Sequence, residues 1–155
     1  MLASRQQLMT IGENMLTGLA HAHKYLGYLT FALTFVSLGL AIAAQVRKSQ
    51  SSATWLYKCH RFGTMLFGRL TVAFGVGLFA AKLPPAAWLA KWPLWTGLLL
   101  WGAIEPIGKR MVNQGARAAM ESQEFSWRPA TGVLIELLLL TTAIGLMTMS
   151  RLGKL

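Results

Sequence analysis

The sequence contains no aspartate, one cysteine and few charged residues for its length. Charged residues make up 13% of the 155 positions, about half of the ~25% that soluble domains carry. The single cysteine, Cys59, excludes an internal disulfide, a CxxC redox motif and a thiolate cluster built from one chain. Without aspartate and with only five glutamates, a carboxylate metal site is not expected, so the sequence predicts no metal centre. GxSxG, HExxH, P-loop and GxGxxG motifs are also absent.

The charge that is present is mostly positive, with a formal net charge of +10. Such a charge is compatible with nucleic-acid binding, but the 15 basic residues lie mainly between apolar runs. Cations that flank apolar runs favour anionic lipid headgroups and set the orientation of a membrane protein. We therefore expect a lipid bilayer, and no nucleic acid, as the partner of this chain.

Long apolar runs are abundant. Residues Tyr25 to Ala44 form a run of 20 without a formal charge, about the number needed to cross the hydrocarbon layer. Four apolar runs predict membrane spans at residues 20–44, 62–81, 92–108 and 130–150. Continuous runs of this kind indicate helices, because helices satisfy their own backbone groups in lipid. The sequence thus predicts an all-α protein: a single domain, 1–155, folded as an integral membrane four-helix bundle.

The segment before the first run also shows a helical pattern. Apolar residues recur at helical spacing at Leu8, Ile11, Met15 and Leu19. This pattern predicts a short N-terminal interfacial helix that leads into the first span. After the third run, the mixed-charge segment from Lys109 can extend the third helix into water.

The distribution of basic residues predicts an orientation. Loops one and three carry eight basic residues, whereas the opposite side carries six. Because positive residues are enriched on the cytoplasmic side, loops one and three are expected in the cytoplasm. We expect the membrane to be a bacterial inner membrane.

Three charged residues lie within the apolar runs: Arg69, Glu105 and Glu136. A rise of about 1.5 Å per residue places Arg69 roughly 13 Å past His60, and Glu136 roughly 12 Å past Arg128. The matching depths predict an ion pair between Arg69 and Glu136. Glu105, which is shallower, would complete this buried charge network or reach the interface. Such a network serves either helix packing or a proton or anion path.

Small and weakly polar residues form lines along the first two spans, and such lines let membrane helices approach closely. The first line is His23, Gly27, Thr30, Thr34, Ser37, Ala41 and Ala44, and the second is His60, Thr64, Gly68, Thr71 and Gly75. They are expected to pack against a neighbouring helix or against a second subunit, and we predict a homo- or hetero-oligomer formed through these faces.

The start of the first span holds candidate cofactor ligands, His21 and His23, next to Lys24. His23 lies on the line of small residues and His21 about 200° around the helix, so His23 is the better candidate for a site within the bundle. Neutral imidazole is a common axial ligand of haem iron. A second histidine ligand from the same chain is not expected, because His60 lies near the other membrane face. The alternative is that the histidines are interfacial residues without a ligand.

Four spans within 155 residues, with histidine at the start of the first, resemble the superfamily of small membrane proteins that includes the HemJ-type protoporphyrinogen oxidases and the CopD and SirB families. His21 or His23 is similar to the histidine of the family's first span, Arg69 to an arginine of the second, and Lys91 to the lysine that opens the third. The family's Asn-Glu pair at the start of span four is absent, and Glu136 comes later. The resemblance implies a haem- or redox-associated protein.

Three functions therefore stand side by side. The first is a haem- or redox-associated membrane protein, with His23 or His21 as the ligand and the cations Lys24, Lys82 or Lys91 near the porphyrin propionates. The second is a non-catalytic structural or accessory subunit of a larger membrane complex. The third is a small ion or proton transporter that uses the buried arginine and glutamates. The sequence does not decide whether the protein is an enzyme.

Overall fold

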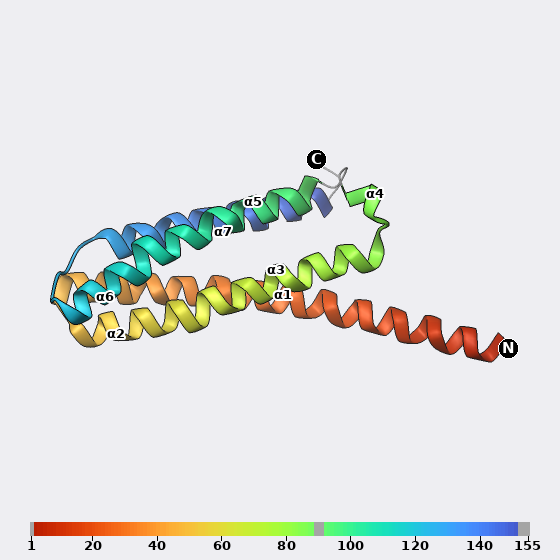
Figure 1. Cartoon of the computed structure of the whole chain (residues 1–155), viewed down its shortest axis with the longest axis horizontal. Coiled ribbons are helices and arrows are strands. Elements are labelled where there is room, and N and C mark those ends of the chain that lie inside the picture. The colour runs from red at the N-terminus through yellow and green to blue at the C-terminus, as the bar shows by residue number, and fades with distance from the viewer. Residues whose placement is uncertain (1, 89–91, 152–155) are drawn as a thin grey trace.

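The computed structural model describes residues 2–88 and 92–151, with side chains described for 12–84, 86–88, 92 and 94–149. The described residues are helical apart from short connections, so the all-α prediction is confirmed. Long helices lie side by side, and the N-terminal part of α1 extends beyond the others (Figure 1). The order is α1 (Leu2–Arg47), α2 (Gln50–Lys58), η1 (Cys59–Thr64), α3 (Met65–Lys82), α4 (Pro85–Trp88), α5 (Trp92–Ile107), η2 (Gly108–Asn113), α6 (Gln114–Glu121) and α7 (Arg128–Arg151).

Helix α1 runs unbroken from Leu2 to Arg47, through the first predicted span. The predicted helix before the first span is therefore present, and it continues into the span without a break. No proline precedes Pro84, and an isolated glycine in a helix costs only about 1 kcal/mol relative to alanine. Nothing in this segment breaks the helix until Lys48, which adopts a φ of 48° and turns the chain.

The second long rod begins twelve residues before the predicted span and consists of α2, η1 and α3 in direct succession. Its N-cap is Ser49, whose hydroxyl accepts a hydrogen bond from the backbone N–H of Ser52 at 3.2 Å. Such a cap satisfies one of the free N–H groups of the first turn. The rod ends at Lys82, because Leu83 is extended in front of Pro84.

The third rod consists of α5, η2 and α6 and continues to Glu121, as expected from the mixed-charge segment after the third span. Pro106 lies inside α5, two residues before the π-helical turn η2. A proline removes one backbone hydrogen bond and crowds the preceding turn, which loosens the helix at this point. Helix α7 matches the fourth predicted span within two residues at its start and one at its end.

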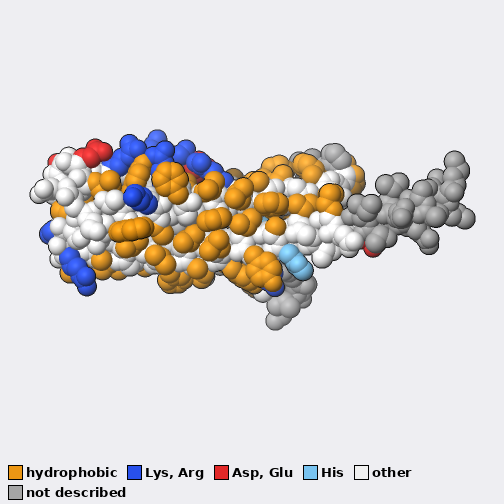
Figure 2. Space-filling view, turned by 90° about the horizontal axis from the view of Figure 1, so that it is seen from below, with side chains coloured by type: hydrophobic (Ala, Val, Ile, Leu, Met, Phe, Trp, Pro, Cys, Tyr) orange, Lys and Arg blue, Asp and Glu red, His pale blue; other side chains and the backbone are white. Residues whose placement is uncertain are grey.

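Three helical stretches of the described chain are long and apolar enough to cross a membrane: Gly12–Arg47, Gln50–Lys82 and Arg128–Met149. Helix α5, with 16 residues, is shorter than these. Large apolar side chains remain exposed on the helices, among them Leu99 and Leu138, at 74% and 60%. The space-filling view shows apolar side chains spread over the middle of the molecule (Figure 2). A surface of this kind is suited to lipid.

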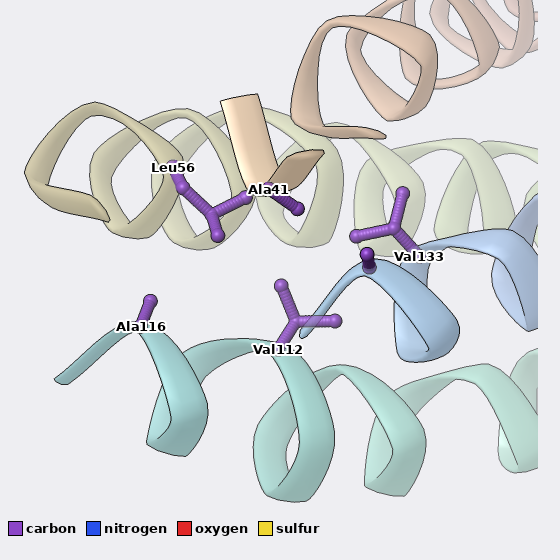
Figure 3. Packing of buried hydrophobic residues seen from close by; sticks show 6 residues of the cluster. Ala41, Leu56, Val112, Ala116 and Val133 are labelled. Atoms are coloured by element: carbon purple, nitrogen blue, oxygen red, sulfur yellow. The ribbon is translucent and has the colours of Figure 1, made fainter. Parts of the chain in front are cut away.

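The buried apolar core lies where the loops join α1 to α2 and α6 to α7. Ala41, Leu56, Val112, Ala116 and Val133 converge there from five elements (Figure 3). Leu56 lies four residues before His60, and Val112 lies next to Asn113. This packing therefore fixes η1 and η2 relative to α7.

The two lines of small residues pack mainly against each other within the chain. Ser37 contacts Thr64 at 3.5 Å between hydroxyl oxygens, and a Cβ at Gly27 would lie 3.6 Å from Thr71. Thr30, Thr34 and Ser37 are at most 2% exposed. The prediction that these faces dock a second subunit therefore finds no support in the structure, because helices of the same chain already cover this part of α1.

Candidate functional site

A buried pair joins the second rod to α7. His60 and Glu136 are both fully buried, and Nε2 of the ring lies 2.9 and 3.1 Å from the two carboxylate oxygens. His60 belongs to η1 and Glu136 lies eight residues into α7. Isolated charges are costly in such a place, so each of the two groups needs the other as its partner.

Asn113 of η2 contacts the other side of the ring. Its Oδ1 lies 3.0 Å from His60 Nδ1, and a carbonyl oxygen only accepts, so Nδ1 carries a hydrogen. A second proton then resides either on Nε2, which gives an imidazolium and a carboxylate, or on Glu136, which gives a neutral pair. Both states keep every hydrogen bond of the group, so the arrangement allows a proton to move between nitrogen and oxygen.

Two π-helical turns bring these residues together. His60 lies in η1, and Gly108 and Asn113 are the first and last residues of η2. A Cβ at Gly108 would lie 2.6 Å from Glu136 Oε1 and 2.8 Å from His60 Cε1, so only glycine allows this close approach. Single π-helical turns within α-helices are rare and frequently occur at functional sites.

A basic hollow of about 320 Å³ lies beside the pair. Four cations line it: Arg61, Arg69, Lys109 and Arg117. Tyr57, Met65, Asn113 and Gln114 complete the lining. Asn113 thus belongs both to the hollow and to the buried pair. Figure 2 shows basic side chains gathered along one edge of the molecule, which agrees with this concentration of charge.

Tyr57 lies between two of these cations. Arg61 and Arg117 both donate hydrogen bonds to its hydroxyl oxygen, the latter at 2.6 Å. Both guanidinium carbons also lie over the Tyr57 ring, at 5.5 and 5.0 Å from its centroid.

The predicted pair of Arg69 and Glu136 is wrong. Arg69 donates to Glu105 at 2.7 Å, and Lys109 lies 2.9 Å from the same carboxylate oxygen. Arg69 is half exposed and Glu105 is 30% exposed, so the three predicted charges do not form one buried network. Glu136 is level with His60, and Arg69 lies nine residues further along its rod, about 13 Å and 2.5 turns away. The depth argument failed because it placed Arg128 level with His60.

The histidines of α1 lie on different sides of that helix, as predicted. His23 packs on α3, where Nδ1 donates to the carbonyl of Thr71 at 2.8 Å and the ring lies against Gly75. His21 is exposed and contacts Tyr25 edge to face, with ring centroids 6.2 Å apart. Lys24 lies over the ring of Tyr28. These three residues therefore do not converge on one site, and the predicted Lys91 lies outside the described residues.

In neutral His23, the bond to Thr71 leaves the lone pair on Nε2, which is the form of imidazole that ligates iron. Within the described residues, no group of three or more histidine, cysteine or acidic side chains could hold a metal ion.

Sequence reasoning overlooked His60 as a site residue and did not consider Asn113. One signal was available for His60. It is followed by Thr64, Gly68 and Thr71 on the small-residue line, which places it on a packed face. Asn113 carried no such signal, because it follows the basic pair Lys109 and Arg110 in a segment that was expected to reach into water.

Comparison of the chain with models of protein families, with curated proteins and with solved structures finds no match. Arguments about function therefore rest on the geometry of the chain itself.

Proposed function

We propose that the chain is a four-span integral membrane protein that takes up and releases a proton at the His60–Glu136 pair, within the class of small proton-coupled transporters. The observation that carries this proposal is the fully buried pair, bonded to Asn113, beside a hollow lined with cations. Ionisable residues that are buried between membrane helices commonly mark proton relays and substrate paths.

The fourth span in this proposal is the α5–η2–α6 rod. It contains 30 residues, Trp92 to Glu121, which corresponds to about 45 Å of helix. It packs along α7 and contacts α3, and its ends lie at opposite ends of the molecule (Figure 1). A rod of this length that lies beside three apolar helices is long enough to cross the same bilayer.

Asn113 supports the assignment of a proton-exchanging pair. Asn113 accepts a hydrogen bond from Nδ1 and also lines the hollow. One edge of the imidazole therefore contacts the buried carboxylate, and the other edge contacts a residue that lines the hollow. A pair that only held helices together would need no such opening. Asn113 thus places His60 one side chain away from the hollow. Its carbonyl oxygen only accepts from Nδ1 and relays no proton itself, so exchange requires that this hydrogen bond opens to water.

The test is proton flux into liposomes that contain the purified protein and a trapped pH-sensitive dye. Glu136→Gln and His60→Gln are expected to lower the flux at least ~100-fold, as when a positioned proton-transfer group is removed. Glu124→Gln, an exposed loop variant, is the control and should retain it. Wild-type flux no higher than that of protein-free liposomes would refute the proposal.

A second candidate function, association with haem, is favoured by one observation. The bond from His23 Nδ1 to Thr71 leaves Nε2 without that partner and fixes its direction. The proposed resemblance to the superfamily of HemJ-type oxidases, CopD and SirB includes a histidine of this same segment. Haem held there would supply one-electron redox chemistry. His23 would bind the iron, Gly75 would give the ring room against α3, and Lys24 would stay near the interface.

For this candidate we expect a Soret band that shifts on reduction with dithionite after expression with added haem. His23→Ala should abolish the band, whereas His21→Ala and His60→Ala should keep it, because His21 is exposed and His60 is bonded to Glu136. A colourless wild-type protein, or equal retention in all three variants, would eliminate His23 as a haem ligand.

A further inference from the structure

We infer that the basic hollow is a binding site for a phosphate group, held by Arg61, Arg117 and Tyr57. This inference goes beyond the proposed proton exchange and rests on other residues. The same phosphate chemistry occurs in anionic lipid headgroups and in free phosphoanions, and the experiment below distinguishes the two sources.

The first argument is the charge balance around the hollow. Glu105 is shared by Arg69 and Lys109, at 2.7 and 2.9 Å. Arg61 and Arg117 form no ion pair with any carboxylate in the described part of the chain, and Glu121 lies one turn beyond Arg117 on α6. Two guanidinium groups therefore converge on one uncharged oxygen. Like charges at this separation repel, so an anion is the complementary ligand.

The second argument is the set of donors. A guanidinium offers a planar fork of N–H groups that matches the oxygens of a phosphate. Each arginine uses one nitrogen on Tyr57, which leaves further N–H groups for a ligand. The Tyr57 oxygen accepts from both arginines, so its own hydrogen is free to donate. Three side chains from two rods thus present donors around one point.

The third argument is the place of the hollow along the molecule. The Gln50–Lys82 rod has 33 residues, about 50 Å, whereas the hydrocarbon layer is about 30 Å thick. Exposed Trp92 and Trp95 mark one interface near the end of α3. The hydrocarbon then begins about 20 residues earlier, near Phe62, so Tyr57 and Arg61 lie at the level of the headgroups. Basic pockets between membrane helices at this level bind phosphate-bearing headgroups.

The experiment measures two kinds of binding to the full chain in neutral detergent. Inorganic phosphate is added in a thermal-shift assay at constant ionic strength. Phosphatidylglycerol, or phosphatidylcholine alone, dissolved in the same detergent is then added in the same assay. The test variant is Arg61→Gln with Arg117→Gln. The control is Arg47→Gln with Arg128→Gln, which removes the same charge from exposed positions outside the hollow.

We expect the control to behave as the wild type and the test variant to bind at least ~10-fold more weakly, because two charge-assisted donors are lost. Stabilisation by inorganic phosphate identifies a free phosphoanion as the ligand. A response to phosphatidylglycerol alone identifies a lipid headgroup. The inference would be overturned if the wild type did not bind. It would also be overturned if both double variants bound equally weakly, because binding would then depend on the overall positive charge and not on Arg61 and Arg117.

Tyr57→Phe keeps both arginines and removes only the hydroxyl. It should weaken binding less than the double variant while the proton flux of the His60–Glu136 pair persists. Proton flux without phosphate binding would refute this inference and leave the proposed function standing. Phosphate binding without proton flux would refute the proposed function and leave this inference standing.

Discussion

At the scale of single residues, the cost of burying His60 and Glu136 determines what they can do. Removing a carboxylate and an imidazolium from water costs several kcal/mol per ion, which a hydrogen-bonded partner on each side offsets in part. The pair has such partners, because Nε2 contacts both carboxylate oxygens and Nδ1 contacts Asn113. Either group alone would be unpaired in a buried place, so the two depend on each other for stability.

This dependence predicts strong coupling in a double-mutant cycle. His60→Gln and Glu136→Gln should each destabilise the protein by about 3 kcal/mol, and the double variant should lose less than the sum by about 1–3 kcal/mol. The measurement is the free energy of unfolding in detergent. A parallel cycle with Arg69→Gln and Glu136→Gln should be additive within about 0.5 kcal/mol. Coupling in the second cycle and not the first would mean that the pairing described here is wrong.

At the scale of elements, the π-helical turns and the glycines set how closely the helices approach. Gly108 lies in η2 directly against Glu136 and His60. On α1 and α3 the small residues place helix against helix, with Gly27 opposite Thr71 and the ring of His23 against Gly75. Because helix packing in membranes depends on close van der Waals contact rather than on exclusion of water, such positions carry much of the stability.

Gly108→Ala tests the close approach of η2. Its Cβ would meet Glu136, His60 and the Met65 sulfur within 2.9 Å, so we expect a loss of about 1–3 kcal/mol and a weakened proton-exchange activity. Gly102→Ala on the same rod has nothing within 4 Å and should be neutral or stabilising by up to about 1 kcal/mol. Thermal unfolding of the two variants gives the comparison. Equal stability of the two variants would show that η2 shifts to accommodate the added Cβ without a loss of free energy of unfolding.

At the scale of the whole molecule, the rods are antiparallel neighbours with their connections at alternating ends (Figure 1). The connections after α1 and after α6 lie at one end, beside the buried apolar core. The connection between α3 and α5 lies at the other end. If all rods cross the bilayer, the first and third loops share one side of the membrane and the second loop faces the opposite side.

Thiol labelling tests this arrangement. In a Cys59→Ala background, Ser51→Cys and Ser126→Cys should react alike with a membrane-impermeant maleimide, and Ala86→Cys should react only from the other side; all three positions are exposed. The predicted orientation requires that the first two react in inverted vesicles and not in intact cells. Labelling of Ala86→Cys together with Ser126→Cys would mean that the third rod does not span.

The sequence by itself determined the helices. Apolar runs, caps and prolines act over a few residues, so α7 was predicted within two residues at either end, and the helical extension beyond the third run was expected. A helix before the first run was also expected, and it continues into the span as part of α1 because no residue breaks it. The lines of small residues also correctly indicated a packed face, since helical spacing alone sets which residues share a face.

Only the tertiary structure decided which polar residues meet. Counting residues from the assumed membrane boundary paired Glu136 with Arg69, whereas the fold pairs it with His60 and pairs Arg69 with Glu105. The vertical offset between two helices, and their rotation about their axes, depend on contacts between segments far apart in the chain. The residue spacing within one helix determines neither this offset nor this rotation. The basic hollow arose in the same way, since its cations come from two rods that only the fold places side by side.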